Sequence, residues 1–115
     1  MIDFACKRFE LRKIIKCGLG LTKADLSLFD YLLEHTEEWF TTEKLAKKLK
    51  LNLSTVQRSV KKLNEKEILM RRQENLNGGG YFFVYRIKYK SEIRKIILDV
   101  VRAWSKGVEK EFDEW

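Results

Sequence analysis

The stretch KKLKLNLSTVQRSVKKLNEKEIL, residues 47–69, decides the fold of this chain of 115 residues. Within it, the apolar residues Val56, Val60 and Leu63 are spaced by four and three, which is the spacing of a helix with one buried face. We therefore predict a helix over residues 53–66. Its opposite face is polar and cationic, so the helix should expose a row of hydrogen-bond donors to solvent.

Two further helices are predicted before this one. Thr22 and Asp25 resemble a capping box, with Asp in place of the usual Glu or Gln, and begin a helix that ends near His35. A short helix follows over residues 43–49. After a tight connection, Asn52 is placed to cap the long helix through its side-chain oxygen. The order of these segments predicts a helix-turn-helix.

A β-hairpin is predicted after the long helix. Residues 68–74 and 81–89 have the composition of strands, and the Gly-rich residues 75–80 form the loop between them. The second strand begins with a cluster of aromatic side chains, and its alternation should bury half of them: Tyr81, Phe82, Phe83 and Tyr85. This hairpin, residues 68–89, would be the wing of a winged helix-turn-helix.

Helices are also predicted at both ends of the chain. Residues 3–17 favour a helix capped by Asp3 and ended by Gly18, although their broad apolar pattern leaves a strand open. Residues 91–115 favour a long final helix. We thus expect a fold that is mainly α with a small β-wing. It would comprise a winged helix-turn-helix domain over residues 1–90 and a C-terminal helix, residues 91–115, in the same compact unit.

The final helix is predicted to hold two copies of the chain together. At roughly 35 Å it is longer than the small core beneath it, and large apolar side chains on a protruding helix most often mark an interface. We expect a symmetric homodimer, the commonest soluble assembly, through Ile93, Ile97, Val100, Trp104, Val108, Phe112 and Trp115. Burial of this stripe against residues 3–17 is the alternative, and both arrangements can hold together.

Positive charge is concentrated in the middle of the chain. The formal net charge is +7, and residues 41–90 alone carry thirteen basic and four acidic side chains, a net charge of +9, whereas each flank is at −1. A local excess of this kind is typical of a protein that binds a polyanion. A lysine-rich solvated surface would not explain the near-neutral flanks. We therefore expect a nucleic-acid-binding face within residues 41–90.

Residues 47–69 resemble the helix-turn-helix of MarR-like and TrmB-like transcription regulators, most clearly in the run STVQR at residues 54–58. Residues 20–25, GLTKAD, are similar to the entry of the first core helix in the archaeal TrmB-like group. The resemblance covers residues 19–90 and implies a module that binds duplex DNA as a dimer. One departure is Glu67, where such regulators commonly have glycine after the recognition helix.

The residue types on the long helix favour DNA contacts independently of that resemblance. The major groove displays base edges to hydrogen-bonding partners, so Gln57 can pair with adenine and Arg58 with guanine. Unpaired amides at the helix start suit a phosphate. We expect this recognition helix in the major groove and the wing on the adjacent backbone or groove. The predicted contact residues are Lys44, Asn52, Ser54, Thr55, Gln57, Arg58, Lys61, Lys62, Arg71 and Arg72.

Other binding functions stay open beside a sequence-specific regulator of transcription. The aromatic residues of the second wing strand could stack single-stranded bases. A non-specific architectural DNA binder fits the small size and basic charge equally well. A winged-helix module that binds other proteins fits the fold but not the concentrated charge. A small-molecule effector would need a site between the dimer helices and the winged domain, for which the sequence names no residues.

The sequence argues against catalysis and against a cofactor. It holds a single histidine, no phosphate-cradling Gly-Lys-Ser/Thr motif and no nucleophile beside a base. Cys6 and Cys17 with His35 are too few for a closed zinc site, so no metal is expected. Neither an apolar run of membrane-span length nor a signal peptide is found, so we expect a cytoplasmic protein without a membrane partner.

Overall fold

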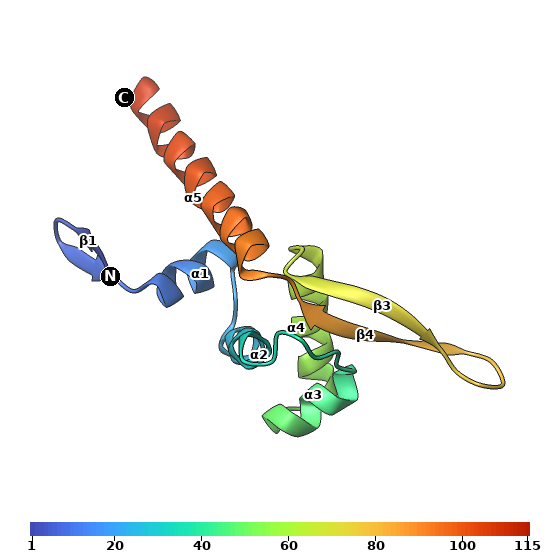
Figure 1. Ribbon diagram of the computed structural model, residues 1–115. Helices are drawn as coiled ribbons and strands as arrows, with labels where there is room; N and C mark the ends of the chain where they lie inside the picture. Colours follow the sequence, from blue (N-terminus) through green and yellow to red (C-terminus); the bar gives the residue numbers. More distant parts are fainter. The chain divides into compact units, whose positions relative to one another are not determined.

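A computed structural model describes residues 1–115. Its elements (Figure 1) follow in the order β1 (Ile2–Phe4), β2 (Lys7–Phe9), α1 (Leu11–Leu19), α2 (Lys23–Leu33), α3 (Thr42–Leu49), α4 (Leu53–Glu65), β3 (Leu69–Asn75), β4 (Tyr81–Ile87) and α5 (Lys90–Asp113). They form two compact units, residues 22–89 and residues 1–21 with 90–115. The prediction of a mainly α fold with a small β-wing is confirmed.

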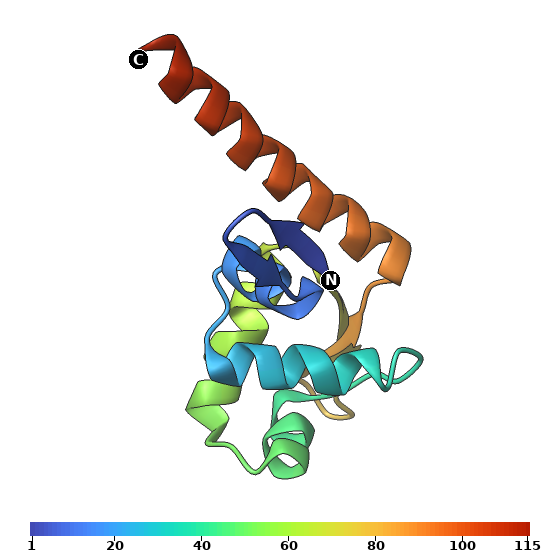
Figure 2. The same ribbon diagram turned by 90° about the vertical axis from the view of Figure 1, so that its left-hand side faces the viewer.

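The unit of residues 22–89 is a winged helix-turn-helix. Its helices α2, α3 and α4 pack against one another, and Figure 2 shows α2 crossing α4. The wing strands β3 and β4 pack against α4 and α2 respectively. Apolar side chains less than 2% exposed fill the space between these elements: Leu28, Leu32, Phe40, Leu45, Val56, Val60, Leu63, Ile68 and Ile87. Removing this apolar surface from water is the main force that holds the unit together.

α2 begins at the predicted capping box. The Thr22 hydroxyl accepts a hydrogen bond from the amide of Asp25 (3.2 Å), and the Thr22 amide donates to the Asp25 carboxylate (2.8 Å). The helix ends at Leu33, two residues before the predicted end at His35. The capping box therefore fixes where α2 starts, and Asp25 is one of its two members.

The turn between α3 and α4 depends on one left-handed residue. Lys50 ends α3 with a φ of 55°, and the amide of Leu51 donates to the carbonyl of Ala46 (3.1 Å). Asn52 occupies the N-cap position of α4, but its side chain makes no capping hydrogen bond, so the predicted side-chain cap is wrong. The Asn52 carbonyl instead accepts the first helical bond from the amide of Val56 (3.1 Å), which defines the helix start without the side chain.

The wing is an antiparallel hairpin that extends from a buried base to an exposed tip. Leu69 pairs with Ile87 at the base, and Asn75 pairs with Tyr81 next to the loop of residues 76–80. Seven residues of strand at about 3.3 Å each give a reach of roughly 20 Å. Figure 1 shows the outer part of β3 and β4 projecting away from α3 and α4.

The helices cover only the base of the wing. There, Phe40 and Tyr85 exchange two amide–carbonyl hydrogen bonds of 2.8 Å, so the segment before α3 adds a short bridge to β4. Val84 and Ile87 are buried at this end. The prediction that half of the four clustered aromatic side chains would be buried is wrong, because none of them is. The alternation of a strand buries one face only where another element covers that face, and the outer wing has no such cover.

The chain begins with a β-hairpin, so the helix predicted over residues 3–17 is wrong in its first half. In place of capping a helix, Asp3 accepts a 2.7 Å hydrogen bond from the guanidinium of Arg8. The rings of Phe4 and Phe9 meet edge to face at 6.4 Å. Both pairs are five residues apart and lie across the β1–β2 ladder, whereas neighbours on a helix are three or four residues apart. The strand that the sequence left open is the conformation observed.

α1 is shorter than predicted and packs against α5. It begins at Leu11 and ends with Gly20, at a φ of 63°, so Gly18 is not the terminating residue. A Cβ atom at Gly18 would lie 3.5 Å from Cγ1 of Val100, which is ordinary contact distance. The first residues of the chain thus group with the C-terminal helix.

α5 is the long terminal helix that the sequence predicts. Ile93 and Ile97 are buried, and Val100 is half-buried, but every residue from 101 to 115 is exposed. Among the exposed ones, Trp104 is 66% and Phe112 is 62% accessible. No helix of the chain combines the length and the apolar character needed to cross a bilayer.

Candidate nucleic-acid interface

The outward face of α4 presents polar and cationic side chains to solvent. Ser54, Gln57, Arg58 and Lys61 are exposed, and Thr55 beside them is half-buried. The side chains of Arg58 and Lys61 form no ion pair or hydrogen bond within the chain. A helix has about 3.6 residues per turn, so the apolar residues of α4 lie on one side and are buried, and the polar residues lie on the opposite side and face solvent. Its donors are therefore available to an external acceptor.

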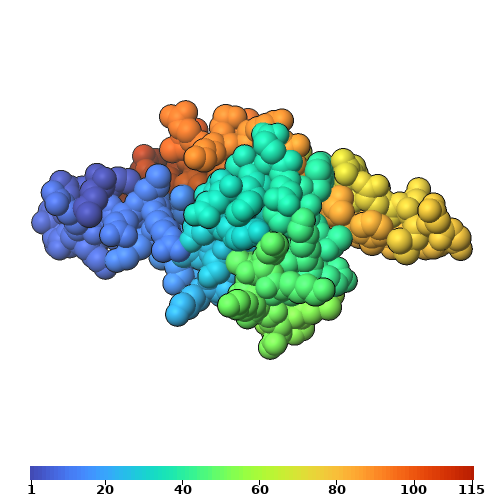
Figure 3. Space-filling view, turned by 60° about the horizontal axis from the view of Figure 1, so that its bottom comes forward, coloured from blue at the N-terminus to red at the C-terminus, as the bar shows by residue number.

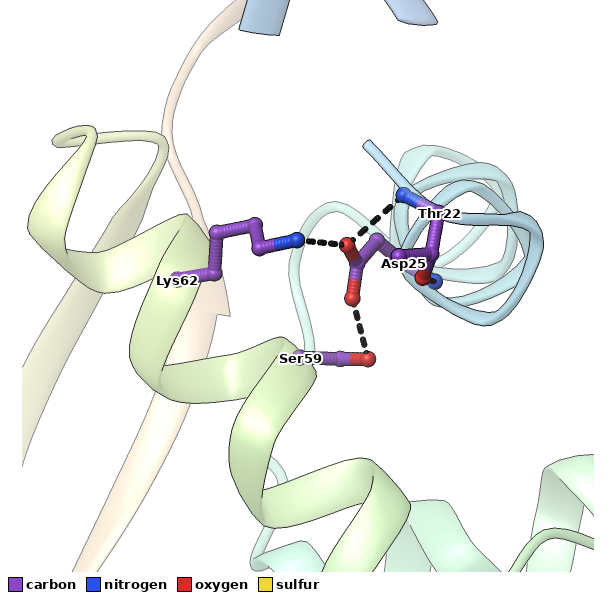
Figure 4. Close-up of polar contacts among 4 residues, drawn as sticks. All are labelled: Thr22, Asp25, Ser59 and Lys62. Atoms are coloured by element: carbon purple, nitrogen blue, oxygen red, sulfur yellow. Dashed lines mark hydrogen bonds and ion pairs between the residues drawn. The ribbon is translucent and has the colours of Figure 1, made fainter. Parts of the chain in front are cut away.

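The inward face of α4 is tied to α2 through one buried carboxylate (Figure 4). Asp25 is 3% exposed and accepts hydrogen bonds from the hydroxyl of Ser59 and from the ammonium of Lys62 (2.7 Å), besides the amide of Thr22. Burial by itself raises the pKa of Asp25, but these hydrogen bonds outweigh it and lower the pKa from 3.8 to about 2. The carboxylate stays charged near neutral pH and joins the cap of α2 to the middle of α4.

Two of the lysines predicted to contact phosphate have acidic partners within the chain. Lys62 forms an ion pair with Asp25. If Lys62 turned outward to a phosphate, the buried carboxylate of Asp25 would lose its cation. Lys44 lies 3.0 Å from Glu38 and 5.1 Å from the centre of the Phe40 ring. The Lys44–Glu38 pair is 46% exposed on both sides, and such surface pairs contribute about 0–1 kcal/mol. Lys44 can therefore exchange its partner for a phosphate at little cost, and Lys62 cannot.

The two predicted wing arginines lie on opposite faces of the hairpin, because successive strand residues alternate. The guanidinium of Arg71 stands 4.4 Å from the centre of the Phe83 ring. That of Arg72 stands 4.3 Å from the centre of the Trp39 ring and pairs with Glu74 at 2.7 Å. Only Arg71 borders the groove beside α4. The structure thus separates the two residues that the sequence grouped.

A groove with a volume of about 290 Å³ lies between α4 and the wing. It brings together three of the predicted contact residues, Gln57 and Lys61 of α4 and Arg71 of β3. The remaining lining residues are Thr42, Glu43, Val60, Asn64, Phe82, Phe83 and Tyr85. Donors from the helix and from the wing therefore share one surface, which has an aromatic wall on the wing side.

Arg86 is a structural residue of the wing that sequence patterns did not single out. Its Nε donates to the carbonyl of Thr36 (2.9 Å), and its Nη2 pairs with Glu37 (2.8 Å). Its side chain is only 17% exposed, and its guanidinium lies 6.0 Å from the centre of the Trp39 ring. These contacts hold the segment before α3 against β4. Its partners are about fifty positions away, so nothing in the local sequence marks this role.

The end of α4 contains a backbone conformation that favours glycine. Glu67 has a φ of 62°, and its amide donates to the carbonyl of Asn64 (3.0 Å) while the amide of Ile68 donates to that of Leu63 (3.0 Å). Residues with a Cβ pay a steric cost in this left-handed region. Glu67, which replaces the glycine common in such regulators, therefore occupies a strained position. The chain still turns there, because β3 begins two residues later.

The predicted dimer residues separate into two groups along α5. Ile93 and Ile97 are buried within the chain and are not available to a partner, and Val100 next to them is half-buried. The exposed members are Trp104, Val108 and Phe112 in the C-terminal half of α5 and Trp115 just after its end. Elsewhere, both cysteines are free, and no group of three or more His, Cys, Asp or Glu side chains is placed to hold a metal ion.

Comparisons with known proteins find a matching family model, a relative in sequence and solved structures of the same fold. A model of the DnaD N-terminal domain matches residues 9–108. A solved structure from Methanosarcina mazei Go1, described as a possible transcriptional regulator, is 53% identical with a TM-score of 0.91, over 100% of this chain and 96% of that one. The uncharacterized protein MJ1503 of Methanocaldococcus jannaschii is 26% identical over 99% of this chain and 85% of its own length. A mutant of S. aureus MepR, solved bound to an oligodeoxyribonucleotide, is 15% identical with a TM-score of 0.55, over 90% of this chain and 72% of that one.

Proposed function

The chain belongs to the DnaD N-terminal domain family, and we propose that it is a transcriptional regulator that binds specific sequences of double-stranded DNA as a homodimer. α4 would lie in the major groove, and the wing would lie on the adjacent backbone or groove. The likeness of residues 47–69 to MarR-like and TrmB-like regulators supports this use of the helix-turn-helix.

The observation that carries the proposal is the unpaired, outward face of α4. Gln57 and Arg58 are exposed at the middle of the helix and have the side chains that recognise adenine and guanine edges. Lys61, one turn further, suits a backbone phosphate. Asn52, Ser54 and Thr55 stand at the helix start, where free amides favour an anion. The segment that holds them has a net charge of +9.

The wing and α3 would add contacts around this helix. Arg71 shares a groove with Lys61, so it can follow the same DNA surface. Lys44 can reach a phosphate once it leaves Glu38. Arg72, on the other face of the wing, is the weaker candidate of the two arginines. We leave Lys62 out of the proposed interface, because its ammonium is committed to Asp25.

Two solved structures support parts of the proposal, one a role in transcription and the other the use of this fold with DNA. The Methanosarcina mazei protein, more than half identical in sequence, is described as a possible transcriptional regulator. The MepR mutant, which is similar in fold alone, was solved with an oligodeoxyribonucleotide. A non-specific architectural binder is an alternative that the same fold and charge serve, whereas a protein-interaction module is an alternative that fits the fold but not the concentrated charge.

The proposed homodimer would form through the end of α5. Trp104 and Phe112 are exposed on α5 and Trp115 is exposed just after its end, and a row of large apolar side chains in water favours association. A two-fold dimer would place its recognition helices about 34–36 Å apart, one turn of DNA, and select a pseudo-palindromic site. Sedimentation should therefore give a dimer for the wild type and a monomer for Trp104→Ser/Phe112→Ser. A wild-type monomer at all concentrations would remove the dimer from the proposal.

Selection from a random duplex library tests the DNA-binding function. We expect a consensus with two related half-sites, and competition with random DNA should give a preference of at least about a thousandfold for the selected duplex. Binding should weaken steeply with salt, because phosphate contacts release counterions. A preference near one would favour the architectural role. No duplex binding at low salt would favour the protein-interaction module and overturn the proposal.

A further inference from the structure

The tip of the wing is apolar and uncharged, although the chain around it is strongly basic. Residues 75–83 read NLNGGGYFF and contain no charged side chain. Leu76 is 52%, Tyr81 is 60% and Phe82 is 38% exposed. A wing that contacts DNA only through phosphates would be expected to carry lysine or arginine at its tip. The exposed apolar side chains of this tip therefore require another explanation.

The loop at the tip has a backbone that only glycine adopts readily. Gly78, Gly79 and Gly80 have φ values of 90°, 111° and 85°. A Cβ atom at Gly78 or Gly79 would meet nothing within 4 Å, so packing within the chain does not require glycine there. The turn thus presents bare backbone outward between Leu76 and Tyr81, and bare backbone permits a close approach to another molecule.

The tip is continuous with the surface that we propose for DNA. Phe82 and Phe83 of β4 line the groove beside α4, together with Lys61 and Arg71. The guanidinium of Arg71 lies over the Phe83 ring, and that ring meets the Tyr81 ring edge to face at 5.5 Å. A ladder of one cation and two rings therefore leads from the basic groove toward the tip. Figure 3 shows this tip standing clear of α3 and α4.

We infer that the wing tip is an apolar wedge that enters the minor groove of duplex DNA, inserts Leu76 or Tyr81 at a base step and kinks the duplex. The inference rests on the proposed function and adds to it a deformation of the DNA. Charge complementarity selects DNA as the occupant, because the surface that leads to the tip is cationic and the tip itself repels no phosphate. Apolar side chains inserted between base steps unstack them and bend the duplex by about 20–90°.

The wedge gives the protein a preference that does not depend on hydrogen bonds to bases. Pyrimidine–purine steps such as TpA are the easiest to unstack and kink. The tip should therefore favour such a step beside the sequence that α4 reads. The insertion replaces the water around Leu76 and Tyr81 with base surface, and this burial offsets the loss of stacking.

Fluorescence of a labelled duplex tests the wedge. The probe is a duplex of about 24 base pairs with G·C ends and alternating T-A steps between them, because these steps deform most easily. It carries 2-aminopurine near its centre and a donor and an acceptor dye at its ends. Affinity is measured separately by anisotropy at low salt. The variants are Leu76→Ser/Tyr81→Ser and, as a matched control, Tyr89→Ser, which is 59% exposed at the other end of the wing.

The wild type should raise both the 2-aminopurine fluorescence and the energy transfer at saturation. The double variant should lose most of both increases while its affinity stays within about threefold of the wild type, since phosphate contacts supply most of the binding. The control should behave as the wild type. Circular dichroism and sedimentation check that the double variant keeps its fold and its oligomeric state.

Four results would overturn the inference. If the wild type saturates the duplex without changing the 2-aminopurine fluorescence or the energy transfer, it binds DNA without a wedge, and the proposed function would survive. Full signals from the double variant would place the deformation elsewhere. A change of oligomeric state in the double variant would make the tip a contact between proteins. If the wild type does not bind the duplex at all, the proposed function fails first and the wedge fails with it.

Discussion

Lys61 and Lys62 are neighbours on α4, and their environments differ completely. Lys61 is exposed, without a partner in the chain, and borders the groove beside the wing. Lys62 is bound to the buried carboxylate of Asp25 at 2.7 Å. Adjacent helical residues are rotated by about 100°, so one lysine faces outward and the other faces α2. Within one basic run, the outward residues are available for recognition while the inward ones hold the helix in place.

The largest effect is expected at the inward face. Asp25→Asn removes the charge that binds Lys62 and should lower the free energy of unfolding by about 2–3 kcal/mol near neutral pH. Because the pKa of Asp25 is lower in the folded chain, at about 2, than its ordinary value of 3.8, its contribution is complete above that ordinary value. The contribution is lost as the pH falls from 3.8 toward 2.

Denaturant unfolding at several pH values measures this contribution. The free energy of unfolding of the wild type should fall as the pH is lowered from 3.8 toward 2, and that of Asp25→Asn should depend less on pH over the same range. Asp99→Asn is the matched control, because Asp99 forms only an exposed pair with Arg102 at 3.6 Å and should change stability little. Equal stability of Asp25→Asn and wild type would mean that the carboxylate does not tie α4 to α2.

The two lysines should separate stability from binding. Lys62→Ala should lower the free energy of unfolding by about 1–3 kcal/mol, because it leaves the buried Asp25 carboxylate without its cation. Lys61→Ala should leave stability within about 0.5 kcal/mol and weaken binding to all duplexes alike, with a salt slope smaller by about one. Thermal unfolding and anisotropy at several salt concentrations give both quantities. A destabilising effect of Lys61→Ala, and not of Lys62→Ala, would contradict the assignment of Lys61 to the outward face and Lys62 to the inward face of α4.

The smallest effect is expected at the end of α4. Glu67→Gly should raise the free energy of unfolding by about 1 kcal/mol or less, because glycine adopts the positive φ of this position without steric cost. Glu65→Gly, two residues earlier and within the helix, should instead lower stability by a similar amount. Denaturant midpoints of the two variants measure this. A stabilising Glu65→Gly or a destabilising Glu67→Gly would contradict the assigned conformation.

The winged helix-turn-helix was predictable because its apolar spacing and its turn signals are local. Val56, Val60 and Leu63 mark one face of a helix whatever they pack against, and the capping box at Thr22 needs only four residues. The roles of Lys62 and Arg86 were not predictable, because their partners are 37 and about 50 positions away. The first hairpin was not predicted, because residues 2–9 contain no turn signal strong enough to favour two strands over a helix.

The same limit applies to the candidate site. The sequence named Gln57, Arg58 and Lys61, and the structure places all three on the outward side of α4. The sequence could not show which basic residues form ion pairs within the chain, because a paired lysine or arginine and an unpaired one look the same in the sequence. Aromatic alternation also failed at Tyr81 and Phe82, because burial depends on what covers a strand and not on the strand alone.

Binding of Arg58→Ala to the selected duplex tests the central claim most directly, with Arg94→Ala on α5 as an exposed control. We expect a loss of about 1–3 kcal/mol in binding free energy, together with a relaxed base preference at one position of each half-site. Arg94→Ala should bind as the wild type does. An Arg58→Ala protein that is folded and keeps both the wild-type affinity and the wild-type preference would contradict the assignment of α4 as the helix that reads DNA.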